Sequence, residues 1–127
     1  MKTSILIARI LLGVIFVVFG LNGFLQFLPQ PPMPQAAIAF FGALAASGYM
    51  LPLLFATQIL GGALLLVGIV PLALLILAPV IVNIMAFHIF LAPDGIPLAV
   101  VVCVLALFLT WANRDSYRPL LVASSDR

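Results

Sequence analysis

The sequence predicts an all-α protein: a four-helix transmembrane bundle with a short interfacial or re-entrant helix between its first and second spans. Two observations support this prediction. Hydrophobic residues make up 66% of the 127 positions and charged residues only 6%, far from the balance of a soluble domain. No charged side chain occurs between Arg9 and Asp94, and a soluble core of this size could not enclose so much apolar surface. We therefore expect a single membrane domain over residues 1–127, with the lipid bilayer as its solvent.

Four apolar runs have the length of about 20 residues that a helix needs to cross a bilayer. They cover residues 4–28, 51–69, 71–91 and 96–113. The second and third are separated by "VGIVP", in which Gly68 can end one helix and Pro71 can begin the next. The third and fourth are separated by "APDGIP", whose Asp-Gly pair between prolines is a strong turn signal.

The one long connection follows the first span. Its four prolines between Pro29 and Pro34 exclude a regular helix there. Residues 35–47 are apolar but too short for a span, and Gly48 follows them, so we expect a helix at the membrane interface or one that enters the membrane partway. A loose loop is the alternative, and it would expose Phe40 and Phe41 to water.

The basic residues indicate the orientation of the chain. All five lie near its two ends: Lys2, Arg9, Arg114, Arg118 and Arg127. By the positive-inside rule both termini are expected in the cytoplasm, and four spans do return the chain to its starting side. Arg9 is expected either to snorkel to the cytoplasmic headgroups or to form an ion pair with Asp115.

Five polar side chains are then expected in the outer half of the bilayer, given a rise of about 1.5 Å per residue. They are the candidate ligand-binding residues Asn22, Gln26, Gln58, Asn83 and His88. Polar groups in hydrocarbon are costly and usually face a bundle interior or a wet cavity. Interhelical hydrogen bonding is the alternative role for Asn22, Gln58 and Asn83, and Gln26 and His88 could simply reach water. Asn83 and His88 are about 140° apart around one helix, so they cannot both point squarely at one site unless that helix is distorted.

Catalytic motifs are mostly absent from the sequence. With one His and no Glu, the chain has too few ligands for a metal site of the His and carboxylate type. The lone Cys103 cannot form an internal disulfide, and so few charges give no basic face for a nucleic acid. If chemistry takes place here, the protein must hold a group that carries it.

Several segments together resemble the DoxX family of small bacterial membrane proteins. "ARILLGVIFVVFGLNGF" is similar to the first-helix signature of that family, "FFGALAASGYMLPLLFATQILGGALLLVG" to its second-helix region, and "PLALLILAPVIVNIMAFHIFLAPDGIPLAV" to its third helix and turn; the tail "LFLTWANRDSYRPLL" also fits. The resemblance covers nearly the whole chain. It implies a four-helix bundle in the bacterial inner membrane, and a link to quinone-reducing complexes and to assemblies for oxidative-stress defence. Many relatives carry an acidic residue where this chain has Gln58, so the resemblance does not bring a proton-relay role to that position.

These observations lead to the hypothesis of an accessory subunit of a membrane redox system that binds a quinone or another small amphipathic ligand in its outer half. His88 would hydrogen-bond a quinone carbonyl and could exchange a proton near neutral pH, while Asn83 and Gln58 would orient the ring. The alternative is a non-catalytic interaction or assembly subunit without a ligand, which would dock a partner subunit or a second copy through faces of small residues. Those faces lie around Gly13, Gly20, Gly61 and Gly62. A minimal small-molecule transporter is a third hypothesis, less favoured because the sequence shows no inverted repeat.

Overall fold

A computed structural model describes residues 1–30 and 32–123. Those residues form helices and no strand: α1 (Lys2–Leu25), α2 (Gln35–Ala46), α3 (Met50–Val67), α4 (Val70–Phe90), α5 (Ile96–Ala112) and α6 (Arg114–Tyr117), with short 3₁₀ helices η1 (Pro93–Gly95) and η2 (Arg118–Leu121). Four helices, of which the last includes η1 and α5, are long and apolar enough to cross a membrane. The predicted all-α four-helix bundle is confirmed, and its helices begin and end close to the expected residues.

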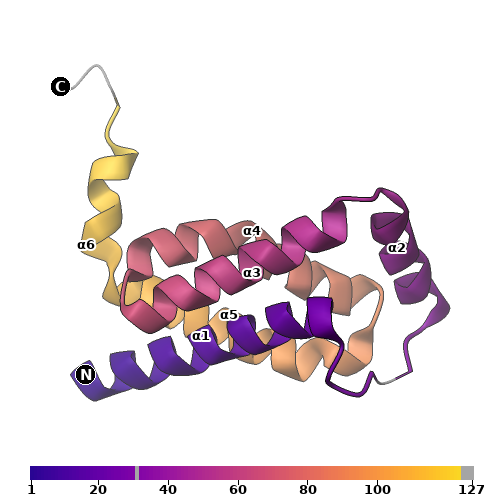
Figure 1. Cartoon of the computed structure of the whole chain (residues 1–127). Helices are drawn as coiled ribbons and strands as arrows, with labels where there is room; N and C mark the ends of the chain where they lie inside the picture. The colour runs from indigo at the N-terminus through magenta and orange to yellow at the C-terminus, as the bar shows by residue number, and fades with distance from the viewer. Residues whose placement is uncertain (31, 124–127) are drawn as a thin grey trace.

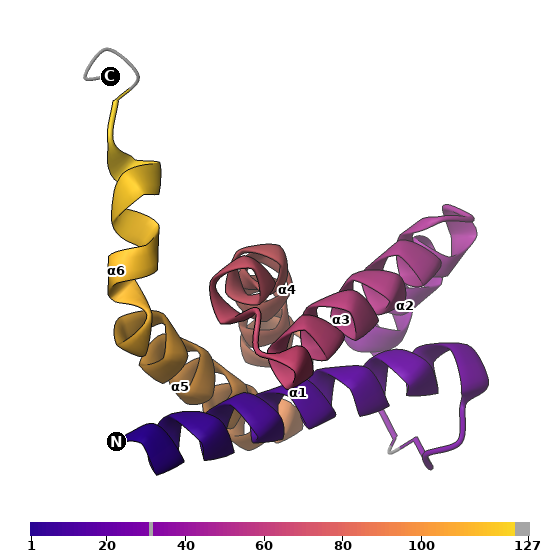
Figure 2. The ribbon, with the colours of Figure 1, turned by 60° about the vertical axis from the view of Figure 1, so that its left-hand side comes forward.

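The helices α1, α3, α4 and α5 lie side by side, and α2 lies across one end of the group (Figure 1). The N-terminus and α6 lie at the opposite end, which we call the terminal end; the end that carries α2 is the α2 end. Beyond α5, α6 and η2 project away from the bundle (Figure 2). The core between the long helices is apolar, and its largest fully buried side chains are Leu12, Phe16, Leu65, Leu77 and Leu109.

The turn from α3 to α4 has the construction that the sequence predicts. Gly68 adopts a φ of 95°, in the left-handed region that favours glycine. Its N–H donates to the carbonyl of Leu65 at 3.2 Å, and the N–H of Ile69 donates to the carbonyl of Leu64 at 2.9 Å, which satisfies carbonyls that the end of a helix leaves free. Pro71 lies in the first turn of α4, where its missing N–H costs nothing.

Glycines bring α1 and α3 into backbone contact. A Cβ on Gly62 of α3 would lie 2.8 Å from the carbonyl oxygen of Gly13 and 2.9 Å from the backbone nitrogen of Val17, both in α1. The neighbouring Gly61 faces α4 instead, where a Cβ would overlap the side chain of Leu77. Small residues permit such close approach of membrane helices. These glycines are therefore used for packing within the chain, and a partner could reach them only if the helices separated.

Arg9 forms a different contact from the ion pair expected with Asp115. Its guanidinium Nη1 donates to the carbonyl oxygens of Leu65 at 2.9 Å and Leu66 at 3.1 Å, at the end of α3. Asp115 lies 3.4 Å from Arg118 instead. The last carbonyls of a helix lack partners within it and carry partial negative charge, so they are suitable acceptors for a cation on a neighbouring helix. The predicted Arg9–Asp115 pair is thus wrong, and Arg9 links α1 to α3.

The short helix α6 is attached to the start of α4 by one side chain. The hydroxyl of Tyr117 donates to the carbonyl oxygen of Pro71 at 3.0 Å. Partial burial raises the pKa of the Tyr117 phenol above its ordinary value of 10.0, because a low-dielectric surrounding disfavours the phenolate. This contact holds the otherwise projecting segment at the terminal end.

Candidate functional site

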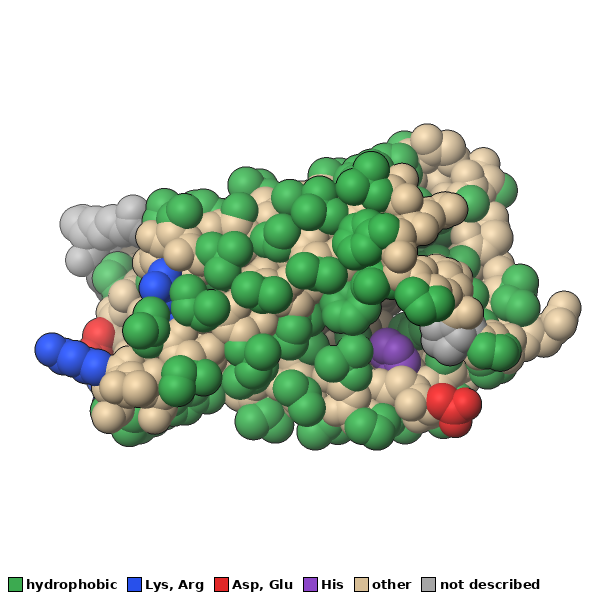
Figure 3. Space-filling model, turned by 60° about the horizontal axis from the view of Figure 1, so that its bottom comes forward, with side chains coloured by type: hydrophobic (Ala, Val, Ile, Leu, Met, Phe, Trp, Pro, Cys, Tyr) green, Lys and Arg blue, Asp and Glu red, His purple; other side chains and the backbone are tan. Residues whose placement is uncertain are grey.

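A cavity of about 380 Å³ lies at the α2 end of the bundle. Its wall is mostly apolar, and its aromatic members are Phe16, Phe19, Phe40, Phe41, Phe55 and Phe87. Its polar members are Asn22, Gln30, Gln58, Asn83 and His88. Figure 3 shows the histidine, in purple, within a hollow of the otherwise green apolar surface. An apolar concave wall with a few convergent polar groups is typical of a small-molecule site.

The structure brings four of the five candidate residues to this cavity. Asn22 comes from α1, Gln58 from α3, and Asn83 and His88 from α4. Gln26 lies outside the cavity wall: it follows α1 in a left-handed conformation with a φ of 52°, and its side chain is exposed. Gln26 therefore marks the end of α1, and the other four residues define the candidate site.

Asn83 and His88 reach the same cavity because the cavity covers a broad face of α4. Ile84 and Phe87 lie between them on that face and also line the wall. Asn83 and His88 then occupy opposite edges of a sector of about 140°. The two residues share the cavity without both pointing at its centre, as the helical spacing required.

Gln58 is the most enclosed of the polar residues. Only 9% of its surface is exposed. Its amide forms no hydrogen bond with any residue that the structure describes. Because every fully enclosed polar side-chain atom of the described residues has a hydrogen-bond partner, the atoms of this amide are not fully enclosed. The free amide therefore opens into the cavity. Gln58 therefore has a hydrogen-bonding capacity that the described chain leaves unused and that a molecule in the cavity could satisfy.

Asn22 combines a structural role with its place in the cavity wall. Its Oδ1 accepts a hydrogen bond from the backbone N–H of Leu28 at 2.7 Å, which ties the start of the proline-rich connection to the end of α1. A backbone N–H can only donate, so it occupies one lone pair of the Asn22 amide oxygen and leaves the second lone pair and the amino group for other partners. This hydrogen bond joins Asn22 to the connection after its own helix, and it is not the interhelical bond of the alternative role.

His88 is fixed by contacts on several sides of its ring. Its Nδ1 lies 2.8 Å from the carbonyl oxygen of Ile84, one turn earlier in α4. The ring meets that of Phe87 edge to face, with centroids 5.2 Å apart. Gly95 of η1 lies directly against the imidazole, because a Cβ there would overlap it. The orientation of the imidazole is therefore determined by the protein.

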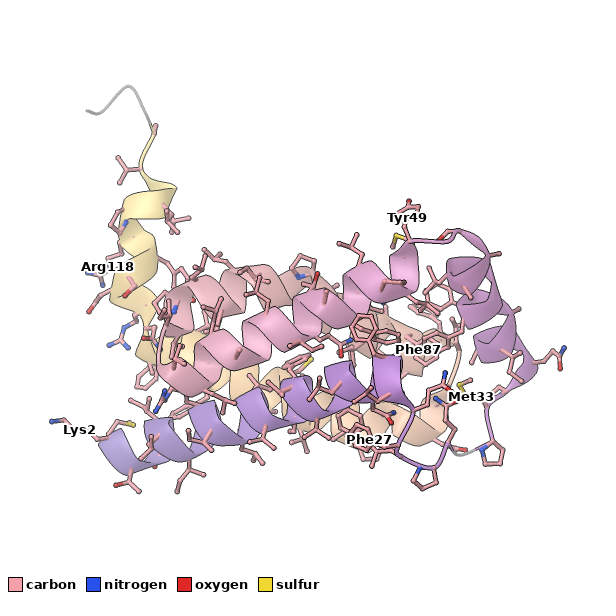
Figure 4. The ribbon with its side chains drawn as sticks, in the orientation of Figure 1. Lys2, Phe27, Met33, Tyr49, Phe87 and Arg118 are labelled. Atoms are coloured by element: carbon pink, nitrogen blue, oxygen red, sulfur yellow. The ribbon has the colours of Figure 1, made fainter. Side chains whose placement is uncertain are left out.

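The helix α2 closes the cavity through an aromatic cluster. The rings of Phe40 and Phe41 lie with their centroids 5.7 and 5.1 Å from that of Phe87, and Figure 4 shows Phe87 on the side of α4 that faces α2 and Met33. Aromatic pairs at such distances contribute about 0.5–1.5 kcal/mol each beyond their buried area. Residues 35–46 thus form a helix packed on the bundle, and the alternative of a loose loop is wrong.

One polar side chain of the wall and the apolar residues beside it were not expected from the sequence. Gln30 lines the cavity together with Leu28, Pro29 and Met33 of the proline-rich connection. The available signal was a Gln between prolines in a segment that must cross the end of the bundle.

The cavity can bind an uncharged ligand through hydrogen bonds and aromatic contacts. None of the described residues that line it carries a charged side chain, and the same part of the chain holds no group of three or more His, Cys, Asp or Glu side chains that could bind a metal. In comparisons with family models, with curated proteins and with solved structures, the chain matches none.

Proposed function

We propose that this chain is a DoxX-like protein of the bacterial inner membrane that binds a small amphipathic ligand, a quinone by preference, as the accessory subunit of a membrane redox system. The observation that supports this most directly is Gln58, a buried residue whose amide opens into the cavity and has no partner in the described chain. The volume of about 380 Å³ lies in the range of sites for small organic molecules. The phenylalanines of the wall suit a flat ring, and the amides suit its oxygen atoms.

The proposed orientation places this cavity in the outer half of the membrane. Lys2, Arg9, Arg114 and Arg118 belong to the elements at the terminal end, which is therefore cytoplasmic under the positive-inside rule. Arg127, the fifth basic residue, lies outside the described residues. The α2 end, with the cavity, then faces the opposite side. A lipid-soluble ligand would enter from the outer leaflet.

The test is to identify what the purified protein carries. Wild type, Gln58→Leu and Thr57→Val are solubilised in detergent, extracted with organic solvent and analysed by mass spectrometry. Thr57 is the matched control, because it precedes Gln58 in α3 but donates to its own helix at Leu53 (2.7 Å) and does not line the cavity. We expect a stoichiometric quinone from wild type and Thr57→Val and none from Gln58→Leu. If no preparation carries a quinone and added quinones do not bind, the proposal is wrong.

A non-catalytic assembly subunit is the second candidate, and it is favoured by an apolar groove of about 490 Å³ between α4 and α5. Cys103, the one cysteine of the chain, lies in the wall of that groove. If a second copy packs there, a short thiol-reactive cross-linker applied to membranes will yield a dimer from wild type and only monomer from Cys103→Ser. Monomer from both would exclude a second copy from this groove.

A further inference from the structure

The segment after α5 leaves the bundle sideways. It consists of α6 and η2 (residues 114–121), and it runs across the direction of the long helices and past the outline of the bundle in both views (Figure 1, Figure 2). The hydrogen bond from the Tyr117 hydroxyl to the carbonyl of Pro71 holds it against the start of α4. Since the long helices are able to cross a membrane, a segment that runs across them at one end lies along the membrane surface, over the lipid beside the bundle.

This α6–η2 segment carries two arginines and one acidic residue. The Cζ of Arg114 lies 4.6 Å from the centroid of the Trp111 ring, and its Nη1 donates to the Trp111 carbonyl at 2.8 Å. The other N–H groups of this guanidinium have no acceptor among the described residues. Arg118 lies 3.4 Å from Asp115, but both side chains are mostly exposed, and a pair of this kind contributes little stability. Both arginines are therefore able to bind an external anion.

Two leucines at the end of the α6–η2 segment are uncovered. Leu120 is 63% exposed and Leu121 is 83% exposed, so no described element lies over them. Arginines together with exposed leucines at a membrane surface are typical of a segment that lies in the interface. Its apolar side chains then enter the boundary of the acyl chains, while its charges stay among the headgroups.

We propose that the α6–η2 segment is a binding site for anionic phospholipid at the membrane surface. The lipid phosphates accept hydrogen bonds from Arg114 and Arg118, since a guanidinium binds phosphate through paired N–H groups. Leu120 and Leu121 enter the acyl-chain boundary beside them. The sideways direction favours lipid over a protein partner, because the segment extends over the lipid that surrounds the bundle. The proposal does not depend on the ligand of the cavity, which lies at the α2 end.

The test follows a fluorescent label on this segment in the full chain. Leu121→Cys in a Cys103→Ser background is labelled with bimane and placed in nanodiscs of phosphatidylcholine with or without phosphatidylglycerol. Brominated lipid quenches a label within the acyl-chain boundary, and acrylamide quenches one in water. Bimane on the native Cys103, in the wall of the groove between α4 and α5, is the control that brominated lipid should quench in both lipid compositions.

We expect brominated lipid to quench the label at position 121 in nanodiscs with phosphatidylglycerol, and acrylamide to reach more of it in phosphatidylcholine alone. Arg114→Gln and Arg118→Gln should each lower the ratio of lipid-quenched to water-accessible label roughly fivefold, the usual effect of one arginine near an anionic surface. Lys2→Gln is the matched control, because it removes a positive charge from α1 at the same end and should leave that ratio unchanged.

The outcomes separate lipid binding from its alternatives. Quenching by brominated lipid that requires phosphatidylglycerol and both arginines supports the proposal. A label that only acrylamide reaches, in either lipid composition, overturns it and leaves the segment in water, open to a protein partner. Lipid quenching that is the same in both compositions, or unchanged in both arginine variants, overturns the role of anionic headgroups. None of these results bears on the cavity, whose ligand is tested by extraction.

Discussion

Gly62→Ala is expected to destabilise the bundle, although alanine is the better helix former. The added methyl group would lie 2.8 Å from the carbonyl oxygen of Gly13 and 2.9 Å from the backbone nitrogen of Val17. No rotamer change can move these atoms, so α1 and α3 must separate by roughly half an ångström to restore normal contact distances. Overpacking of this kind costs about 1–3 kcal/mol, and the higher helix propensity of alanine returns about 1 kcal/mol. We therefore expect a net loss of up to about 2 kcal/mol in the free energy of unfolding.

The measurement is reversible unfolding by sodium dodecyl sulfate in mixed micelles, followed by circular dichroism. Gly42→Ala is the matched control, because a Cβ on Gly42 meets nothing within 4 Å and reports helix propensity alone. Gly61→Ala adds a second comparison, since the three atoms nearest to its Cβ all belong to the side chain of Leu77. A smaller residue at position 77 should therefore restore the stability that Gly61→Ala loses. Val17→Ala should restore only part of the stability that Gly62→Ala loses.

If Gly62→Ala unfolds at the same detergent fraction as Gly42→Ala, α1 and α3 are not in backbone contact and the reasoning is refuted. The same conclusion follows if Val17→Ala fully restores the stability of Gly62→Ala, because the obstruction would then be a side chain.

Four further predictions concern polar side chains. Gln58→Leu should leave the free energy of unfolding of the ligand-free protein unchanged or raise it by up to about 1 kcal/mol, since it adds apolar surface to the wall and the amide that it removes forms no hydrogen bond within the described chain; a loss of stability in the same unfolding assay would mean that the amide is bonded within the chain. Arg9→Met should lower that free energy by about 1.5–3 kcal/mol, the usual contribution of hydrogen bonds to a charged group, and Arg9→Lys should lower it less; equal effects would show that the paired acceptors at the end of α3 are unimportant. Tyr117→Phe should cost about 1 kcal/mol at neutral pH by removing the bond to Pro71. Because burial raises the pKa of this phenol, its contribution is present below pH 10.0 and is lost as the pH rises through the folded-state value, so a stability profile of the variant should lack that alkaline loss. Gln26→Gly should stabilise the protein by about 1 kcal/mol, the cost of a left-handed residue with a Cβ, and leave ligand binding unchanged; weaker binding would place Gln26 in the site after all.

Most of the fold could be predicted from the sequence because the membrane imposes strong constraints on it. A span needs a fixed length of apolar residues, and glycine and proline at Gly68, Pro71 and Pro93 mark the turns. The candidate site was predicted on the same grounds, since amides in hydrocarbon are rare and costly. Depth along the bilayer was sufficient to group Asn22, Gln58, Asn83 and His88, which the structure places around one cavity.

What the sequence did not reveal is how the helices are rotated against each other and which atoms meet. The partner of Arg9 is a pair of backbone carbonyls, Leu65 and Leu66, which leave no trace in residue identity. Gly61 and Gly62 are adjacent, yet one faces α4 and the other α1. Gln30 reaches the cavity through the course of an irregular connection. Each of these features depends on contacts between segments far apart in the sequence. Such contacts are determined by the packing of the whole fold and not by a local sequence pattern.

The described residues of the cavity wall carry no formal charge, and this determines how occupancy of the cavity would respond to the membrane potential. Moving one elementary charge through a potential of 100 mV involves about 2.3 kcal/mol, whereas a neutral molecule that settles among these amides and phenylalanines moves none. Its binding would therefore neither draw on the transmembrane voltage nor respond to it. Occupancy would follow the amount of ligand dissolved in the lipid, so the site would report the composition of that pool and be insensitive to how strongly the membrane is energised.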